Sequence, residues 1–371
     1  MIFNTQDSSS EKINMNPSIK VVLAVMSLAL WAVPVLATIH TVPEQHPTIQ
    51  AAHDASTAGD TILVAAGTYS PGPTINRQIT IIGAGIDNPR TEVQGGLTFV
   101  TGADGSILEG LHFRFGTPSF LVSIASNVGP ITLRRCVIDN TTTSGGTGLL
   151  FSSGLNTILE NCLLLQSNNP SVNNVQLIRM DGGTDSLVIR NSVLACGHAA
   201  TSGSGYAMFA SLRAVVMVNS VIANVHKVFE VTSSAPVICI NNIGWNVGDW
   251  SGSLSNALFG NNASNNIVPD GSDAVLLTTS PFLNFDSTYS FGTSDLHLDA
   301  VDGTPCIDAG AETVLDLLDS TRSDLGVYGG PLPFVDSGAP PYPYITSLTV
   351  PVIAPAGGSM QIQGTARIGR E

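Results

Sequence analysis

The chain has 371 residues, of which 14 are Lys or Arg and 28 are Asp or Glu, so its formal net charge is −14 at pH 7. Nucleic acids and anionic membranes are unfavourable partners for so acidic a chain, because their phosphates are repelled rather than neutralised. Charged residues are only 11% of the chain, 43% is hydrophobic and 37 residues are glycine, which argues against disorder and favours short strands separated by many turns.

The first predicted element is a targeting segment. Lys20 precedes an apolar run that ends at Ala37 with small residues, the pattern that signal peptidase recognises. We therefore predict a signal peptide over residues 1–37 and a mature chain that is secreted or attached to the cell surface. An uncleaved anchor is the alternative, but the run is short for a membrane span and contains Pro34. A signal that starts at Met15 would be more compact, and the sequence leaves both starts open.

A short amphipathic helix and a strand are expected next. The helix is predicted around Ile49 to Ala58, and the strand "TILVA" lies between turns at Gly59 and Gly67. If strands stack beyond this point, the helix covers the open end of the stack, where strand edges are otherwise unpaired.

Short apolar segments then recur with Asn, Gly or Arg at the centre. A period of 20 to 30 residues with one strand core per unit indicates a solenoid, because a single unit cannot bury its own face. We predict an all-β fold, a right-handed parallel β-helix with two or three strands per coil, since leucine-rich repeats would need a fixed leucine frame and a helical return. Asn and Gly suit its tight corners, which need a left-handed backbone. The predicted corners are Gly83, Gly110, Arg135, Asn161, Asn191, Asn219, Asn241 and Asn265.

Two ladders of equivalent side chains follow from this alignment. Small residues come directly after the corners, and they are Cys136, Cys162, Ser192 and Ser220. The residues directly before the corners carry charges of alternating sign, and these residues are Glu109, Arg134, Glu160 and Arg190. If the coils stack in this register, each charge lies beside opposite ones, and exposed pairs contribute some tenths of a kcal/mol each.

The cysteines are too sparse for a disulfide framework, and none has the CxxC or CxxH spacing of a metal site. We expect Cys136, Cys162, Cys196, Cys239 and Cys306 to be small buried hydrophobic residues.

The stretch from His40 to Gly85, with Pro-Thr-Ile-Gln-Ala-Ala, Gly-Asp-Thr, Gly-Thr-Tyr and Ile-Thr-Ile-Ile-Gly, resembles the opening of secreted proteins with the pectin lyase-like right-handed β-helix fold. Residues 295–310 and 322–330 are similar to a terminal motif of bacterial surface β-helix proteins, in which this motif closes the last coil. The resemblance covers residues 38–331 and implies the fold and export, without implying an activity. Residues 332–371 are predicted as a Pro-rich linker and a short β tail, with Gly357 and Gly358 at a hairpin turn.

Catalytic signatures of enzymes with this resemblance are weak. Polygalacturonase-like families need several carboxylates and a Gly-His-Gly motif, and the nearest match is "CGHA" at residues 196–199, without the partner motifs. Pectinesterase motifs are absent. Lyase-like relatives use a basic side chain and calcium, and the candidates here are Arg179, Lys227 and Glu230, with Asp181 and His226 close to them in sequence. The other interpretation is a solvated surface pair of Lys227 and Glu230.

Tryptophan and aspartate supply further candidates. Trp245 and Trp250 are predicted to stack on sugar rings if they are exposed, and otherwise fill a gap where a coil shortens. Turn formation is the simpler role for the aspartates considered as calcium ligands, Asp270, Asp273, Asp295 and Asp299. We therefore predict no metal site and no cofactor, except calcium if the protein is a lyase.

Two functions remain open from sequence. The first is a non-catalytic, monomeric solenoid that binds an extracellular polysaccharide or a surface partner along its outer face. The second is a polysaccharide lyase or glycosidase that acts on a uronate-containing polymer, with Arg179, Lys227 and Glu230 at its site.

Overall fold

The computed structural model describes residues 37–371 except for 115–119, 141–149, 153, 167–174, 181–185, 197–204, 211–213, 232–235, 251–253, 255, 286–288, 318, 337–342, 350–362 and 369–371. The predicted signal peptide, apart from Ala37, lies outside the described residues, and so does Asp181. Among the helices that are described, none is long and apolar enough to cross a membrane.

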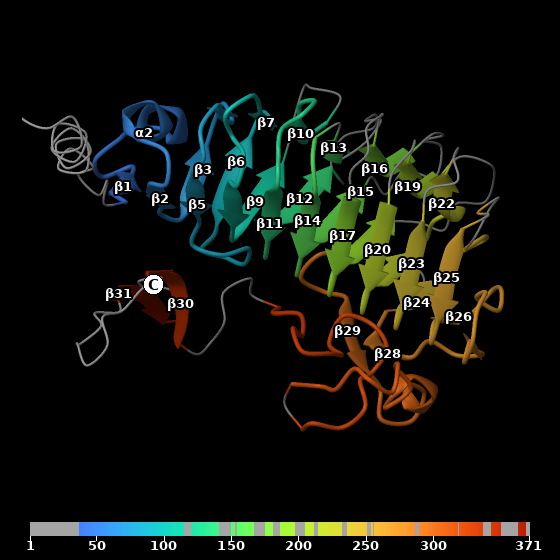
Figure 1. The fold of residues 1–371 in the computed structure, drawn as a ribbon. Helices are drawn as coiled ribbons and strands as arrows, with labels where there is room; N and C mark the ends of the chain where they lie inside the picture. The colour runs from blue at the N-terminus through green and yellow to red at the C-terminus, as the bar shows by residue number, and fades with distance from the viewer. Residues whose placement is uncertain are drawn as a thin grey trace, which may run out of the picture. The chain divides into compact units, whose positions relative to one another are not determined.

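The fold is a right-handed parallel β-helix, as predicted. The chain visits three parallel sheets in turn, which we call sheets A, B and C, and strands of successive coils lie side by side in each sheet (Figure 1). The described residues contain one α-helix and one 3₁₀ helix, η1 (Thr304–Cys306), so the helical returns of leucine-rich repeats are not found in that part of the chain.

Sheet A precedes the corners. Side chains alternate along its strands between the interior and the outer face, as in the strand Ser186–Arg190, where Leu187 and Ile189 are buried. Its strands, in spatial order, are β1 (Ile39–Val42), β2 (Thr61–Val64), β5 (Thr80–Ile82), β8 (Ile107–Glu109), β11 (Ile131–Arg134), β14 (Thr157–Glu160), β17 (Ser186–Arg190), β20 (Ala214–Val218), β23 (Val237–Ile240) and β25 (Ala257–Gly260).

Sheet B follows the corners. Several of its strands are buried along their whole length, because both faces of this sheet are covered. Its strands are β3 (Gly67–Tyr69), β6 (Thr91–Gln94), β9 (Leu111–Arg114), β12 (Val137–Asn140), β15 (Leu163–Gln166), β18 (Val193–Cys196), β21 (Val221–Ala223), β24 (Ile243–Trp245), β26 (Ala263–Ser264) and β27 (Val275–Leu276).

Sheet C completes each coil. Its strands are β4 (Thr74–Ile75), β7 (Leu97–Phe99), β10 (Val122–Ile124), β13 (Leu150–Ser152), β16 (Val175–Met180), β19 (Gly205–Ala210) and β22 (Lys227–Val231). Two antiparallel pairs lie outside the three sheets, and they are β28 (Phe282–Asn284) with β29 (Asp295–Leu298), and β30 (Pro343–Thr349) with β31 (Gln363–Ile368). The predicted turn at Gly357 and Gly358 lies outside the described residues.

The asparagine corners have the left-handed backbone that the sequence predicted. The φ angles of Asn161, Asn191, Asn219 and Asn241 are 55°, 46°, 47° and 62°. Asn adopts this region at lower cost than most other residues with a Cβ atom, since its short amide can hydrogen-bond locally.

Two predicted corners differ from the expectation. The φ of Gly83 is not in the left-handed region that the prediction required. Asn265 is not a corner. The coil after Asn241 turns at Asn261, whose φ is 52° and whose N–H donates to Ser272 O at 2.8 Å. The sequence contains two Asn-Asn pairs four residues apart, and the alignment chose the second pair. Asn265 instead joins another column, where its Nδ2 donates to Asn246 Oδ1 at 3.2 Å.

Small and polar side chains form a buried ladder beside the corners. Cys162 N–H donates to Ser192 Oγ at 3.0 Å, and Ser192 N–H donates to Ser220 Oγ at 3.3 Å. The ladder continues beyond the predicted residues, because Ser220 N–H donates to Asn242 Oδ1 at 2.9 Å and Asn242 N–H donates to Asn262 Oδ1 at 3.0 Å. Each of these four buried backbone N–H groups therefore has a side-chain acceptor from the next coil.

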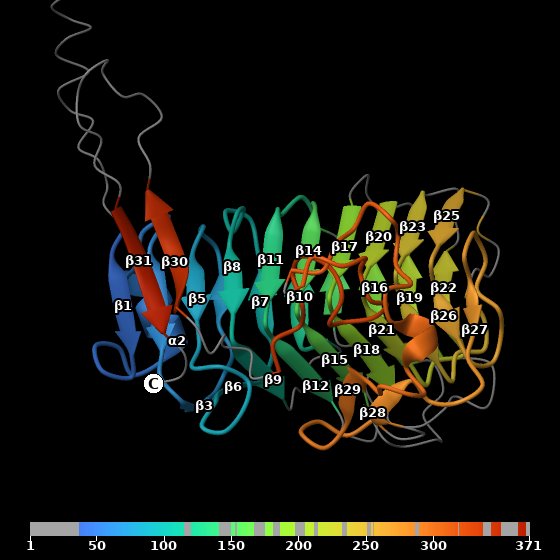
Figure 2. The ribbon, with the colours of Figure 1, turned by 90° about the horizontal axis from the view of Figure 1, so that it is seen from below.

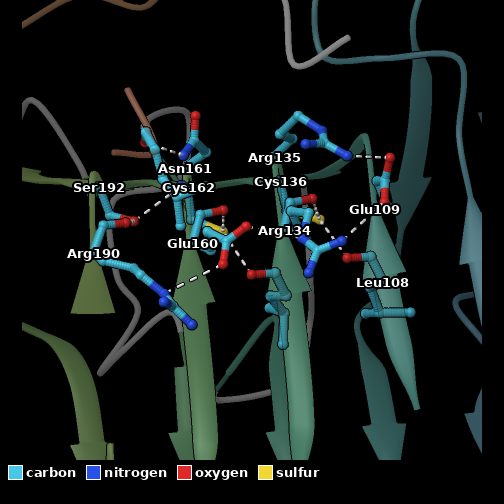
Figure 3. Close-up of polar contacts among 12 residues, drawn as sticks. Leu108, Glu109, Arg134, Arg135, Cys136, Glu160, Asn161, Cys162, Arg190 and Ser192 are labelled. Carbon is cyan, nitrogen blue, oxygen red and sulfur yellow. Dashed lines mark hydrogen bonds and ion pairs between the residues drawn. The ribbon is translucent and has the colours of Figure 1, made fainter. Parts of the chain in front are cut away.

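The predicted charge ladder is present, but it is less exposed than expected (Figure 3). Glu160 forms ion pairs with Arg134, 3.0 Å from its Nε, and with Arg190, 3.3 Å from its Nε, while Arg134 Nη1 lies 3.9 Å from Glu109. The corner residue Arg135 also pairs with Glu109. The two glutamate side chains are only 7% and 11% exposed, whereas Arg134 and Arg190 are 35% and 40% exposed. The pairs are therefore partly buried, and partial desolvation strengthens the attraction.

The amphipathic helix α2 (Ile49–Ala55) packs against β1 and β2 at the N-terminal end of the solenoid. Thr48 caps it by accepting from Ala51 N–H at 3.0 Å, and Ile49, Ala52 and His53 are its buried residues. It ends three residues before the predicted Ala58, and it occupies the predicted capping position.

The C-terminal segment does not close the last coil. Residues 277–285, 289–317 and 319–336, which we call the returning segment, run back beside the corners toward earlier coils (orange to red in Figure 2). Asn261 donates to Ala309 O at 3.1 Å, Asn219 to Asp324 O at 3.0 Å, Asn191 to Gly329 O at 2.7 Å and Asn161 to Leu332 O at 3.1 Å. The corner amides thus bind the backbone of the returning segment, one coil after another.

The returning segment also covers the outer face of sheet B. Phe282, Phe285, Leu296, Leu325 and Val327 form a second hydrophobic cluster there with apolar residues of β12, β15, β18, β21 and β24. The sequence analysis expected a ligand along an outer face of the solenoid without specifying the sheet. These contacts leave the outer faces of sheets A and C as the candidates in the described part of the solenoid.

Candidate functional site

The structure brings Arg179, Lys227 and Glu230 to sheet C. In strand register, Arg179 of β16 lies opposite Phe209 of β19, which lies opposite Glu230 of β22. Paired strands are about 4.8 Å apart, so the backbones of Arg179 and Glu230 are separated by roughly 10 Å. The three predicted residues therefore share one sheet, but Arg179 is two coils away from the other two.

Lys227 is engaged in an ion pair. Its Nζ donates to Glu230 Oε2 at 2.7 Å and lies 6.0 Å from the centre of the Tyr206 ring. The hydrogen bond to Glu230 raises the pKa of Lys227 above its ordinary value, although desolvation acts in the opposite direction. Lys227 is therefore protonated at neutral pH, and it can attract an anion but cannot accept a proton.

Two residues that the sequence analysis missed extend this site. Gln176 of β16 lies opposite Tyr206 of β19, which lies opposite Lys227. Both side chains are partly exposed. Asp249 forms an isolated parallel bridge with Lys227. The sequence does contain a signal for these two residues, because "VQLIRM" and "GYAMFA" place a polar or aromatic residue two positions before the buried Ile178 and Met208. These strands are not next to an Asn corner, so the repeat pattern based on the corners does not include them.

The site has cationic, aromatic and amide groups in two adjacent columns. Gln176, Tyr206 and Lys227 form one column, and Arg179 and Glu230 belong to the other. On the described strands of sheet C, Arg179 and Lys227 are the basic residues and Glu230 is the acidic one. Arg can bind a carboxylate through two parallel hydrogen bonds, and a tyrosine ring can pack against the apolar face of a sugar.

Both tryptophans are buried, so the sugar-stacking role, which required exposed rings, is wrong, and the alternative role of filling a gap is confirmed for Trp250. Trp245 is 5% exposed and lies in the cluster beneath the returning segment, while Trp250 is 1% exposed and lies in the solenoid core. A Cβ atom at Gly244 would lie 2.4 Å from Trp250 Cζ2, so the glycine makes room for the ring. Trp250 fills the interior of a short coil, and neither indole presents a surface to a sugar.

The aspartates considered as calcium ligands lie in turns and strand ends. Asp273 has a left-handed φ of 54°, and Asp299 accepts from Val301 N–H at 2.7 Å and Asp302 N–H at 3.0 Å. Asp295 binds His297 instead, at 2.7 Å from Nδ1. A group of three or more His, Cys, Asp or Glu side chains placed to hold a metal is not found among the described residues.

Family comparison gives a clear result. The model of the family described as rhamnogalacturonase A/epimerase, pectate lyase-like, matches residues 37–255, which is more than half of the chain. The chain belongs to this family. The match covers the coils that carry Arg179, Lys227 and Glu230, and the returning segment lies beyond it. No protein with a curated description matches the chain.

Solved structures with a similar fold are distant in sequence. Pectate lyase Pel9A is 16% identical, with 78% of this chain and 96% of that chain covered and a TM-score of 0.48. The pectin methylesterase from Aspergillus niger is 14% identical, with 65% and 80% covered and a TM-score of 0.39.

Proposed function

We propose that the protein binds a uronate-containing polysaccharide along the outer face of sheet C without cleaving it. This proposal depends mainly on the ion pair of Lys227, whose Nζ lies 2.7 Å from Glu230 Oε2. This contact raises the pKa of Lys227. A lyase reaction needs a basic group that accepts the proton beside the uronate carboxylate. The paired ammonium cannot do this, whereas it can attract a carboxylate.

Binding by this face needs a set of contacts that follows the polymer. Arg179 and Lys227 supply positive charge on neighbouring columns, and Tyr206 lies in the strand between theirs. Successive coils repeat about every 4.8 Å, so an extended polymer that runs along the solenoid meets a new strand at regular intervals. Membership of a pectate lyase-like family supports a pectin-type polymer as the ligand.

The location and the assembly state are part of the same proposal. The apolar N-terminal run and the family support a protein that works outside the cell or attached to its surface. We propose that it acts there as a monomer, since one sheet face supplies all the contacts named above.

The test is binding of polygalacturonate to the purified protein, measured by calorimetry. Arg179→Gln removes a charge-assisted hydrogen bond and is expected to raise Kd by about tenfold. Arg190→Gln is the matched control, because it removes the same charge from the outer face of sheet A, where the Arg190 side chain is 40% exposed. Equal effects of the two variants would refute a site on sheet C, since they would indicate attraction by net charge alone.

Cleavage is tested in the same samples. The proposal expects no rise in ultraviolet absorbance from unsaturated product during incubation with polygalacturonate. A rise that Lys227→Ala abolishes would replace binding with the lyase activity considered from the sequence. A rise that survives Lys227→Ala would also refute the non-catalytic proposal and would place the base elsewhere.

A further inference from the structure

A pocket lies between sheet B and the returning segment, on a different sheet from the proposed polymer site. Its volume is about 350 Å³, within the size range of small-molecule sites. Leu163 of β15 and Val193 of β18 form its apolar floor, and residues 289–297 and 327–336 form most of its walls. Its shape therefore depends on the docking of the returning segment on the solenoid.

The charged groups in this pocket are acidic. Asp87, Asp295 and Asp336 line it, and Lys and Arg are not found among its described lining residues. Uronates and phosphates would be repelled by this lining. The same carboxylates can accept hydrogen bonds from the hydroxyl groups of an uncharged ligand.

Aromatic side chains also line the pocket. Tyr328 and His297 stack with their ring centres 3.7 Å apart and their planes at 14°, and Phe334 meets Tyr328 edge to face at 6.0 Å. Phe291 also lines the pocket and packs against the ring of the buried His112 at 5.3 Å. Aromatic faces of this kind contact the apolar C–H faces of sugar rings.

The polar groups are fixed before any ligand arrives. Tyr328 donates its hydroxyl hydrogen to Asp336, and His297 donates its backbone N–H to Asp295 at 3.0 Å, with its ring Nδ1 at 2.7 Å from the same oxygen. The stacked rings thus hold two carboxylates on one wall of the pocket. A site whose side chains are held in place loses less conformational entropy when a ligand binds.

We propose that this pocket binds a neutral sugar ring, which stacks on the aromatic wall while its hydroxyl groups donate to Asp295 and Asp336. The ligand class follows from three features of the lining: its carboxylates exclude an anion, its aromatic rings fit C–H faces, and its size suits a small molecule. The site is separate from sheet C, so one surface of the protein takes an acidic chain and the other takes an uncharged sugar.

The experiment measures binding of galactose, rhamnose, arabinose and xylose to the full chain by saturation-transfer NMR and calorimetry. Galacturonic acid and glucosamine are included as an anionic and a cationic probe. The variant is Asp336→Asn, at an exposed position. The matched control is Asp319→Asn, an exposed aspartate of the returning segment that accepts from Thr321 N–H outside the pocket.

At least one neutral sugar is expected to bind, with Kd raised about tenfold by Asp336→Asn and unchanged by Asp319→Asn. Binding of glucosamine alone would overturn the proposal in favour of a cation site, and binding of galacturonic acid with equal affinity would also overturn it. Absence of binding to every neutral sugar would reject the site. Arg179→Gln, which tests the polymer site on sheet C, is expected to leave the sugar affinity unchanged, so the two proposals fail independently.

Discussion

The corner asparagines are expected to stabilise the protein in two separable ways. Asn191 has a left-handed φ of 46°, is 3% exposed, and donates from Nδ2 to Val327 O at 2.9 Å and to Gly329 O at 2.7 Å. Asn191→Gly keeps the backbone conformation accessible but removes both hydrogen bonds. Asn191→Ala removes the same bonds and leaves a Cβ atom in the left-handed region without the amide that lowers the cost of this conformation.

The magnitudes follow from these contacts. Two hydrogen bonds to buried carbonyls contribute about 2 kcal/mol together, and the extra chain entropy of glycine adds about 0.5–1 kcal/mol, so Asn191→Gly is expected to cost about 3 kcal/mol. Alanine avoids the entropy term, but the left-handed conformation costs alanine up to about 1–2 kcal/mol more than it costs asparagine, so Asn191→Ala is expected to cost up to about 3–4 kcal/mol. Asn161→Gly should cost less, since Asn161 makes one such bond, to Leu332 O at 3.1 Å.

The assay is equilibrium unfolding in guanidinium chloride together with hydrogen exchange of residues 322–332. Both Asn191 variants are expected to lower the unfolding midpoint and to speed exchange in this part of the returning segment, while exchange in β8 and β11 stays unchanged. An Asn191→Gly protein as stable as the wild type, within about 0.5 kcal/mol, would refute the argument that the corner amides hold the returning segment.

Two further predictions concern buried titratable groups. Burial raises the pKa of Cys162 and of Cys196 to about 12, so thiol reagents should leave the folded protein unmodified and label all five cysteines after denaturation; rapid labelling of the native protein would contradict this. Burial lowers the pKa of His112 in the folded protein, although the contact with Asp139 acts in the opposite direction. Between this lowered pKa and the value of about 6.5 in the unfolded chain, the unfolded chain binds more protons than the folded protein, so stability falls as pH falls. Melting temperatures of wild type and His112→Gln from about pH 7 to about pH 5 test this, and equal slopes would count against it.

Local pattern was sufficient to predict the repeating part of the fold. Each coil contains the same local pattern, which is a charge, a left-handed corner and then a small residue. Because this pattern recurs with the period of the repeat, it could be predicted for successive coils. Glu160 between Arg134 and Arg190 could be predicted for this reason, because parallel pairing in one register forces equivalent positions to stack. The error at Asn265 arose where two Asn-Asn pairs fit the same local pattern.

The tertiary structure decided which of the solenoid's surfaces are available. Asn219 bonds to Ser323 and Asp324 across more than one hundred residues, and no period connects these positions. For the same reason the burial of Trp245 and the pocket between sheet B and the returning segment were not predictable from the sequence. Repetition specifies contacts between neighbouring coils, whereas the docking of a non-repeated segment depends on the complementarity of two surfaces that form only when the chain has folded.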